Sequence, residues 1–254
     1  MMRDIRGMSV AITGGGSGIG AGAARYFAAR GAEVTICGRR AEKLDAVAAS
    51  IGPACRTIVA DITCDGDRRA FIDAAAAHGG GIDLLLSNAG NMYRGPITDL
   101  DQTRLLDVFN VNVVAGMLLS GLAVPHLETR RGAIVFIGSV HARRAFPGAS
   151  PYAATKGAIE VLTKVLAAEL GTKQIRVGCV IPGAVPTELN IRAGLFSEAE
   201  HAKRMDAIAP YHALGRIGTE DEIAEAIDYL ARAEWTTGTT LTVDGGLALG
   251  LAPF

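Results

Sequence analysis

Short apolar runs rich in β-branched residues alternate with alanine-rich stretches almost from one end of the chain to the other. Several of these runs, such as MSVAIT and GAIVFIGS, are apolar on both faces, which is typical of strands in a parallel sheet covered by helices on each side. The pattern predicts about seven strands, over Ser9–Thr13, Glu33–Cys37, Arg56–Ala60, Ile82–Ser87, Ala133–Ser139, Ile175–Ile181 and Thr239–Val243.

The segments between these strands have the length and composition of helices. The predicted helices are Ile19–Arg30, Glu42–Ser50, Gly66–His78, Asp101–Leu127, Ala149–Gly171 and Thr219–Arg232. No low-complexity linker, internal repeat or change in composition divides the 254 residues. The alternation therefore predicts an α/β fold, a single-domain doubly wound parallel sheet with helices on both faces, spanning residues 1–254.

One long segment, 184–214, breaks the alternation. Its sequence, AVPTELNIRAGLFSEAEHAKRMDAIAPYHAL, is amphipathic and irregular, with prolines near both ends. Long excursions between a strand and the next helix are usually functional. We expect this segment to form a lid or wall that recognises the substrate.

Composition and charge exclude several classes of protein. Hydrophobic residues make up 49% of the chain and the net charge is −1, so neither disorder nor nucleic-acid binding is expected. The four cysteines lack the spacing of a disulfide framework or a metal site, so no metal is predicted. The N-terminus lacks a secretory apolar region, and the longest apolar stretch, Val111–Val124, is too short to cross a bilayer. We expect a cytoplasmic protein that binds no membrane.

The first predicted strand leads directly into a glycine-rich turn, Thr13–Gly20, and then into a helix. Glycines allow tight turns and leave room for a phosphate, and the following helix presents unpaired N–H groups and the positive end of its dipole. The order of strand, turn and helix favours a dinucleotide site over a purely structural turn. Its predicted cofactor-binding residues are Gly14, Ser17, Gly18, Ile19 and Gly20.

Two further strand ends fit the same cofactor. Asp61, next to Ile62, follows the third strand, where its carboxylate could accept a hydrogen bond from the adenine amino group; the alternative is a helix cap. Asn88, Ala89 and Gly90 end the fourth strand, at the edge where open α/β sheets bind ligands.

The end of the second strand carries the signal for cofactor choice. An acidic residue there would bind the ribose 2′-hydroxyl of NAD, but this chain has Gly38, Arg39 and Arg40. Two guanidinium groups suit a 2′-phosphate, so NADP(H) is favoured over NAD(H). Against this, Ser17 is not basic, and an arginine here could instead stack on adenine.

The candidate catalytic residues are a tyrosine and a lysine four residues apart. Tyr152 and Lys156 share one face of a predicted helix. A free tyrosine has a pKa near 10, and a nearby ammonium that lowered it by about three units would supply roughly 4 kcal/mol of differential stabilisation. Ser139, at the end of the fifth strand, could bind the substrate oxygen. Asn112 is a polar residue in an apolar helix and could anchor a water that leads to Lys156, with Asn110 as the competing candidate.

Together these motifs resemble the short-chain dehydrogenase/reductase family over nearly the whole chain. The matching motifs are TGGGSGIG at Thr13–Gly20, Asp61, NAG at Asn88–Gly90, VN at Val111–Asn112, Ser139, YAATK at Tyr152–Lys156 and PG at Pro182–Gly183. The resemblance implies an NAD(P)-dependent oxidoreductase that transfers a hydride between nicotinamide and an alcohol or ketone carbon.

The resemblance also implies residue roles. Asn112, Ser139, Tyr152 and Lys156 would form a catalytic tetrad, with Tyr152 as the acid/base and Lys156 also binding the nicotinamide ribose. Asn88 would support the pocket, and Pro182, Gly183 and Thr187 would line the nicotinamide end, although Pro186 alters that loop. The ending GTTLTVDGG resembles that of members that are usually tetramers, so a homotetramer is expected.

Two other functions stay open at this point, a related lyase or epimerase and a cofactor-binding regulator without turnover. The intact tetrad favours hydride transfer over both. The substrate is not evident, and the loop after Ser139 carries His141, Arg143 and Arg144. We hypothesise that one of these arginines meets an anionic or polar substrate; the alternative is a solvated loop charge.

Overall fold

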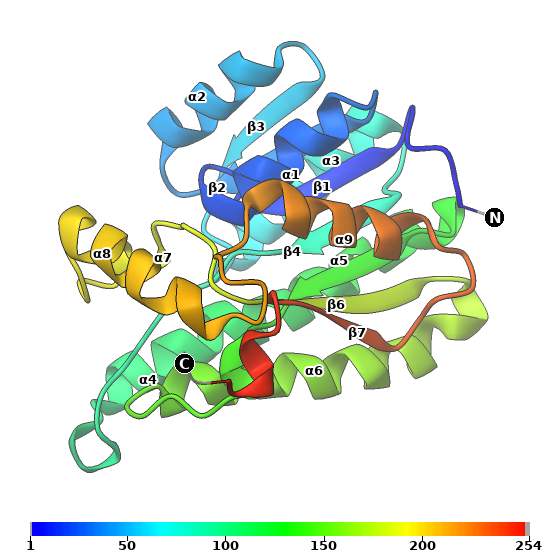
Figure 1. The fold of residues 1–254 in the computed structure, drawn as a ribbon. Helices are drawn as coiled ribbons and strands as arrows, with labels where there is room; N and C mark the ends of the chain where they lie inside the picture. The colour runs from blue at the N-terminus through cyan, green and yellow to red at the C-terminus, as the bar shows by residue number, and fades with distance from the viewer. Residues whose placement is uncertain (1, 252–254) are drawn as a thin grey trace.

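A single seven-stranded sheet organises the chain in the computed structural model, which describes residues 2–251 (Figure 1). All neighbouring strands are parallel, in the order β3-β2-β1-β4-β5-β6-β7. This order confirms the predicted doubly wound sheet, with the switch point between β1 and β4. The strands are β1 Ser9–Thr13, β2 Glu33–Gly38, β3 Cys55–Val59, β4 Leu84–Ser87, β5 Ala133–Ile137, β6 Arg176–Pro182 and β7 Thr239–Val243.

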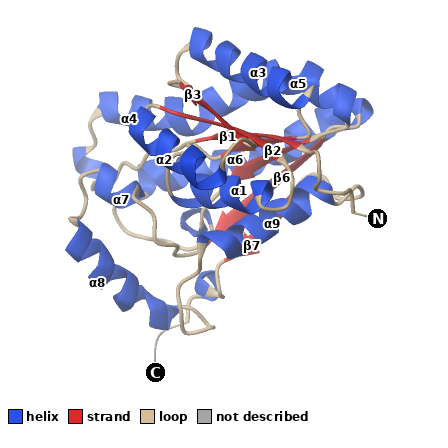
Figure 2. Ribbon diagram, turned by 90° about the horizontal axis from the view of Figure 1, so that it is seen from above, coloured by secondary structure: helices blue, strands red, loops and turns tan. Residues whose placement is uncertain are grey.

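Helices cover both faces of the sheet (Figure 2). Alternate strand residues supply the two cores, so that Val10 and Ile12 pack on one face and Ala11 on the other. One face carries α1 Gly18–Ala28, α2 Ala41–Ile51 and α9 Glu220–Arg232. The opposite face carries α3 Asp65–Gly79, α5 Ala115–Arg130 and α6 Ser150–Leu170. Burial on both sides explains the strands' continuous apolar runs.

The predicted helix at 101–127 is not regular. It consists of α4 Gln102–Phe109, a π-helical turn at Asn110–Val114, and α5. A π turn inserts an extra residue into the helix and rotates the residues after it, and such turns occur often at functional sites. Nothing in the residue pattern predicts this turn.

The run 102–130 is also the one described helical stretch that is long and apolar enough, by length and composition, to cross a bilayer. Four of its residues, Ala115, Leu119, Ala123 and Leu127, are instead fully buried in the core under the sheet. Core packing accounts for part of its hydropathy, while Met117 and Leu118 remain about half exposed.

The excursion predicted at 184–214 contains two helices, α7 Leu189–Arg192 and α8 Glu198–Ile208. Figure 1 shows both beyond the carboxyl ends of the strands. Ser197 and Glu200 form a capping box that starts α8. The backbone N–H of Gly218 donates to the carbonyl oxygen of Ala184 at 2.9 Å, so the two ends of the segment between β6 and α9 lie next to each other.

Candidate active site

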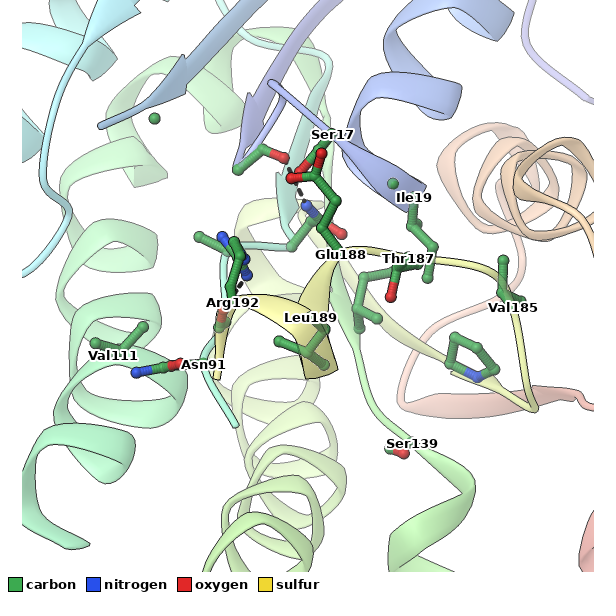
Figure 3. Close-up of a pocket in the computed structure, with 18 of the residues that line it drawn as sticks. Ser17, Ile19, Asn91, Val111, Ser139, Val185, Thr187, Glu188, Leu189 and Arg192 are labelled. Carbon is green, nitrogen blue, oxygen red and sulfur yellow. Dashed lines mark hydrogen bonds between the residues drawn. The ribbon is translucent and has the colours of Figure 1, made fainter. Parts of the chain in front are cut away.

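A cavity of about 320 Å³ lies at the carboxyl ends of the strands, around the switch point (Figure 3). Clefts of this size hold small molecules and cofactors. Most of the residues predicted to bind the cofactor or to catalyse line this cavity: Gly14, Ser17, Gly18, Ile19, Arg39, Asp61, Ile62, Asn88, Ala89, Gly90, Ser139, Tyr152, Lys156, Pro182, Gly183 and Thr187. Gly20, Arg40 and Asn112 are not among the residues that line it.

The glycine turn has the shape of a phosphate cradle. Gly14 and Gly18 adopt positive φ angles of 67° and 54°. A side chain on Gly14 would come within 3.0 Å of the Ala89 Cα atom, and one on Gly18 within 3.1 Å of the Thr187 side chain. Ser17 caps α1 in position, but its side chain makes no capping hydrogen bond, which leaves the first N–H groups of α1 available to an anion.

Thr13 and Asn88 lock the turn to the end of β4. The Thr13 hydroxyl oxygen accepts hydrogen bonds from the backbone N–H groups of Asn88 and Ala89, both at 3.0 Å. The Asn88 amide donates in turn to the carbonyl oxygens of Thr13 and Gly14, at 2.8 and 3.2 Å. Asn88 therefore shapes the cavity by holding two strand ends together.

At the far end of the cavity, Asp61 and Arg39 face each other. One Asp61 oxygen accepts hydrogen bonds from the backbone and hydroxyl of Thr63, and the other lies 3.8 Å from Arg39 Nη1. These contacts hold the pKa of Asp61 below its usual value against the effect of burial. The alternative role as a helix cap is wrong, since Cys64 occupies the cap position of α3.

Ser139 and Tyr152 meet at the opposite end. β5 ends at Ile137, two residues earlier than predicted, and Ser139 lies in the turn after it. The Ser139 hydroxyl lies 3.2 Å from His141 Nδ1, and the His141 ring packs edge-on against Tyr152, with 5.3 Å between ring centroids. Burial lowers the pKa of His141 to about 4, with the positive charges of Arg94 and Arg204 adding to the effect.

The expected lowering of the Tyr152 pKa is not found. Tyr152 is 6% exposed, and its burial raises its pKa to about 12, while a hydrogen bond with Ser139 acts in the opposite direction. Lys156 Nζ donates to the carbonyl oxygen of Ile137 at 2.8 Å and lies 5.5 Å from the centre of the Tyr152 ring. Burial lowers the pKa of Lys156 to about 8. The sequence prediction weighed the ammonium charge but not the burial of both groups.

Asn112 forms hydrogen bonds with the backbone of Asn91, which follows Gly90. Its side-chain oxygen accepts from the Asn91 backbone N–H at 2.7 Å, and its amide nitrogen donates to the Asn91 carbonyl oxygen and the Thr155 hydroxyl. The π turn places Asn112 in the interior, whereas Asn110 is exposed. With its amide occupied in this way, Asn112 fixes the segment after Gly90. The water-mediated link from Asn112 to Lys156 stays a prediction.

Several lining residues were not predicted. Asn91, Val185, Glu188, Leu189 and Arg192 all lie on the cavity wall. Glu188 forms ion pairs with Arg40 and Lys43, and Arg192 Nη2 donates to the Gly90 carbonyl oxygen at 3.0 Å. Most of these residues come from the irregular excursion, where the sequence has no periodicity that assigns a side chain to a face.

The arginines proposed from the loop after Ser139 are engaged elsewhere. Arg143 pairs with Glu160 and donates to the Thr240 hydroxyl, and Arg144 donates to the Leu247 carbonyl oxygen at 2.8 Å. Both therefore have structural partners.

Comparison with known proteins agrees with this geometry. The family model described as enoyl-(acyl carrier protein) reductase matches residues 14–248. A solved structure described as a short chain dehydrogenase/reductase family protein is 35% identical, with a TM-score of 0.83 over 97% of this chain and 100% of that chain. The chain belongs to the short-chain dehydrogenase/reductase family.

Two other members show the range of this family. A 3β-hydroxysteroid dehydrogenase 1 from Eggerthella lenta is 33% identical over 98% of this chain and 97% of its own length. The crystal structure of a 3-ketoacyl-(acyl-carrier-protein) reductase from Brucella melitensis, complexed with NADH, is 33% identical with a TM-score of 0.86 over 96% and 99% of the two chains. As a member, the chain is an oxidoreductase that acts on alcohol or carbonyl groups with a nicotinamide cofactor.

Proposed function

We propose that this short-chain dehydrogenase/reductase works as an NADP(H)-dependent carbonyl reductase, with Tyr152 as its proton donor. The observation that carries the proposal is that Ser139, Tyr152 and Lys156 line the same cavity as the glycine turn. A nicotinamide cofactor, when bound, supplies the hydride. The cavity fits such a group because the turn leaves room for phosphates and the wall carries three buried polar side chains at the reacting end.

The protonation states of these residues favour reduction. With a pKa of about 12, Tyr152 holds its proton at neutral pH and can donate it to an oxygen that gains negative charge. Ser139 can donate a second hydrogen bond to the same oxygen. Lys156 supplies a positive charge that favours the tyrosinate left behind.

Replacing Tyr152 with phenylalanine tests the proton donor. The Tyr152→Phe variant removes the hydroxyl but keeps the ring that packs against His141. We expect ketone reduction to fall at least a thousandfold while the dissociation constants for NADPH and NADH change less than threefold, measured by steady-state kinetics and calorimetry. Turnover retained in this variant would mean that another group transfers the proton.

NADP(H) is proposed because no acidic residue ends β2. Gly38 occupies that position, and the exposed guanidinium of Arg39 lines the cavity beside it. Calorimetric titration with NADPH and with NADH decides between the two cofactors. Tighter NADPH binding is expected, tighter NADH binding would overturn the choice, and binding of neither would overturn the dinucleotide site.

We also propose that the substrate carries an anionic group. Two guanidinium groups whose positive charges lower the pKa of His141 support this: Arg94 donates to the Pro147 carbonyl oxygen at 3.0 Å, and Arg204 stacks on Phe196. Neither is within ion-pair distance of a carboxylate among residues 2–251.

Matched substrates test this charge preference. With levulinate and its methyl ester as probes, the Arg94→Gln/Arg204→Gln variant is expected to lose at least fivefold in kcat/KM for the acid and less than twofold for the ester. Equal effects on the two probes would show that the arginines are solvated loop charges.

We further propose a cytoplasmic homotetramer. The proposal is supported by large apolar side chains that remain about half exposed on α4, α5 and α6 and on the π turn: Leu106, Val114, Met117, Leu118, Val161 and Val165. Exposed apolar surface of this kind marks association sites.

A further inference from the structure

Glu188 carries a negative charge into the cofactor cavity, at the rim of the glycine turn. Its carboxylate lies between two cations from the start of α2, with Arg40 Nη1 at 2.8 Å from one oxygen and Lys43 Nζ at 2.9 Å from the other. Arg40 also donates from Nη2 to the Ser17 hydroxyl at 3.1 Å. Figure 3 shows Glu188 and Ser17 next to each other above the cavity.

The two cations hold Glu188 in different ways. Lys43 donates a hydrogen bond to Oε1. The contact between Arg40 and Oε2 is an ion pair without hydrogen-bond geometry, and Oε2 is buried with no hydrogen-bond partner. The hydrogen bond from Lys43 and the positive charges of Arg40 and Lys43 keep the pKa of Glu188 below its usual value, so the carboxylate is charged at neutral pH. Arg40 can therefore leave Glu188 while Lys43 still holds it.

Arg40 is at the place where a phosphate on the adenosine ribose would be recognised. It follows the end of β2 by two residues, and its contact with Ser17 sets its guanidinium against the phosphate turn. An anion that binds Arg40 must compete with the carboxylate of Glu188 for the guanidinium group. It is also repelled by the negative charge of that carboxylate. The 2′-hydroxyl of NAD(H) carries no charge and meets neither penalty.

We propose that Glu188 is a specificity-determining residue of the cofactor site: it acts as an internal counter-ion of Arg40 and reduces the preference for NADP(H) over NAD(H). The inference rests on the proposed NADP(H) site. It adds that two opposing charges set the preference between NADP(H) and NAD(H). Arg39, whose nearest carboxylate is 3.8 Å away, favours the phosphate, and Glu188 opposes it.

Calorimetric titration of NADPH and NADH into four proteins tests this role. They are the unaltered protein, Glu188→Gln, Arg40→Gln and the double variant. Glutamine keeps an oxygen that can accept from Lys43, so the loop contact survives. We expect Glu188→Gln to bind NADPH about tenfold more tightly, a change of about 1.4 kcal/mol, and NADH within twofold of the original. In the Arg40→Gln background, the same substitution should change NADPH binding less than twofold.

Glu198→Gln is the matched control. Glu198 is exposed on the same excursion, outside the cavity wall, and forms no ion pair among the described residues. It should leave both dissociation constants within twofold. If Glu188→Gln weakens both nucleotides equally, or leaves their ratio unchanged, Glu188 only holds the loop and the inference is wrong, although the proposed function stands. If none of the proteins binds either nucleotide, the proposed function fails as well.

Discussion

At the scale of single residues, burial sets the charges of the catalytic groups. Tyr152 and Lys156 are 6% and 5% exposed, and their pKa values of about 12 and 8 both favour the neutral form relative to water. The sequence predicts which residues line the site. An error of one or two residues at a strand end leaves the spacing between the motifs unchanged. It does not predict their protonation, since that depends on how completely neighbouring segments cover them.

The pH dependence of the reaction depends on the state of Tyr152. Reduction needs the protonated form, which persists to high pH, and oxidation needs the tyrosinate, whose fraction rises about tenfold per pH unit below the pKa. We expect kcat for ketone reduction to stay within threefold between pH 6 and 7.5, where Lys156 with its pKa of about 8 is still mostly charged, and kcat for alcohol oxidation to increase steeply over that range. An oxidation rate that levels off at pH 7 would place the working pKa of Tyr152 far below 12.

His141 makes the folded state sensitive to mild acid. Its pKa is about 4 when folded and near 6.5 when unfolded, so the unfolded chain binds the proton first as the pH falls. The contribution of His141 to the free energy of unfolding is therefore complete above about pH 6.5 and is lost as the pH falls towards 4. About 2 kcal/mol of it is lost by pH 5. Urea unfolding at pH 7 and 5 should show a smaller pH effect in His141→Gln. An equal effect in both proteins would exclude His141 as the cause.

At the scale of elements, most strands and helices were predictable to within a few residues. The strands are buried on both faces of the sheet, so their sequences are continuous apolar runs. The exceptions are the π turn and the two helices of the excursion, α7 and α8. The π turn at Asn110–Val114 and the short helix α7 depend on tertiary contacts, such as those of Asn112 with Asn91, that no local pattern encodes. Glu188 and Arg192 were missed for the same reason.

A buried arginine ends helix α9. Arg176, at the start of β6, donates to the carbonyl oxygens of Leu230, Ala231 and Ala233 and is 8% exposed. Arg176→Met would remove its hydrogen bonds to the carbonyl oxygens of Leu230 and Ala231, whereas that of Ala233 would keep the Thr236 N–H, and we expect the free energy of unfolding to fall by about 3 kcal/mol. Arg56→Met, at an exposed position on β3, is the control and should change it by less than about 0.5 kcal/mol. Similar losses in both variants would contradict a capping role for Arg176.

At the scale of the whole molecule, the exposed apolar residues of α5 and α6 concern assembly. Val161 is 62% exposed on α6, and Val59 is 61% exposed on the edge strand β3. If α6 forms the proposed subunit interface, Val161→Asp should convert the tetramer to a smaller species in light scattering after gel filtration, while Val59→Asp should not. A tetramer that persists in Val161→Asp would exclude α6 as the interface.

The hydrogen bond between Gly218 and Ala184 affects which parts of the sequence can vary during evolution. Because the two ends of the excursion lie together, its length and sequence can be altered without moving helix α6, which carries Tyr152 and Lys156, or the strand that leads into the glycine turn. The segment that is expected to recognise the substrate is therefore separable from the reaction centre. A lineage can alter the part of the excursion that follows Arg192 and leave the cavity residues Thr187, Glu188 and Arg192, and with them the chemistry, unchanged.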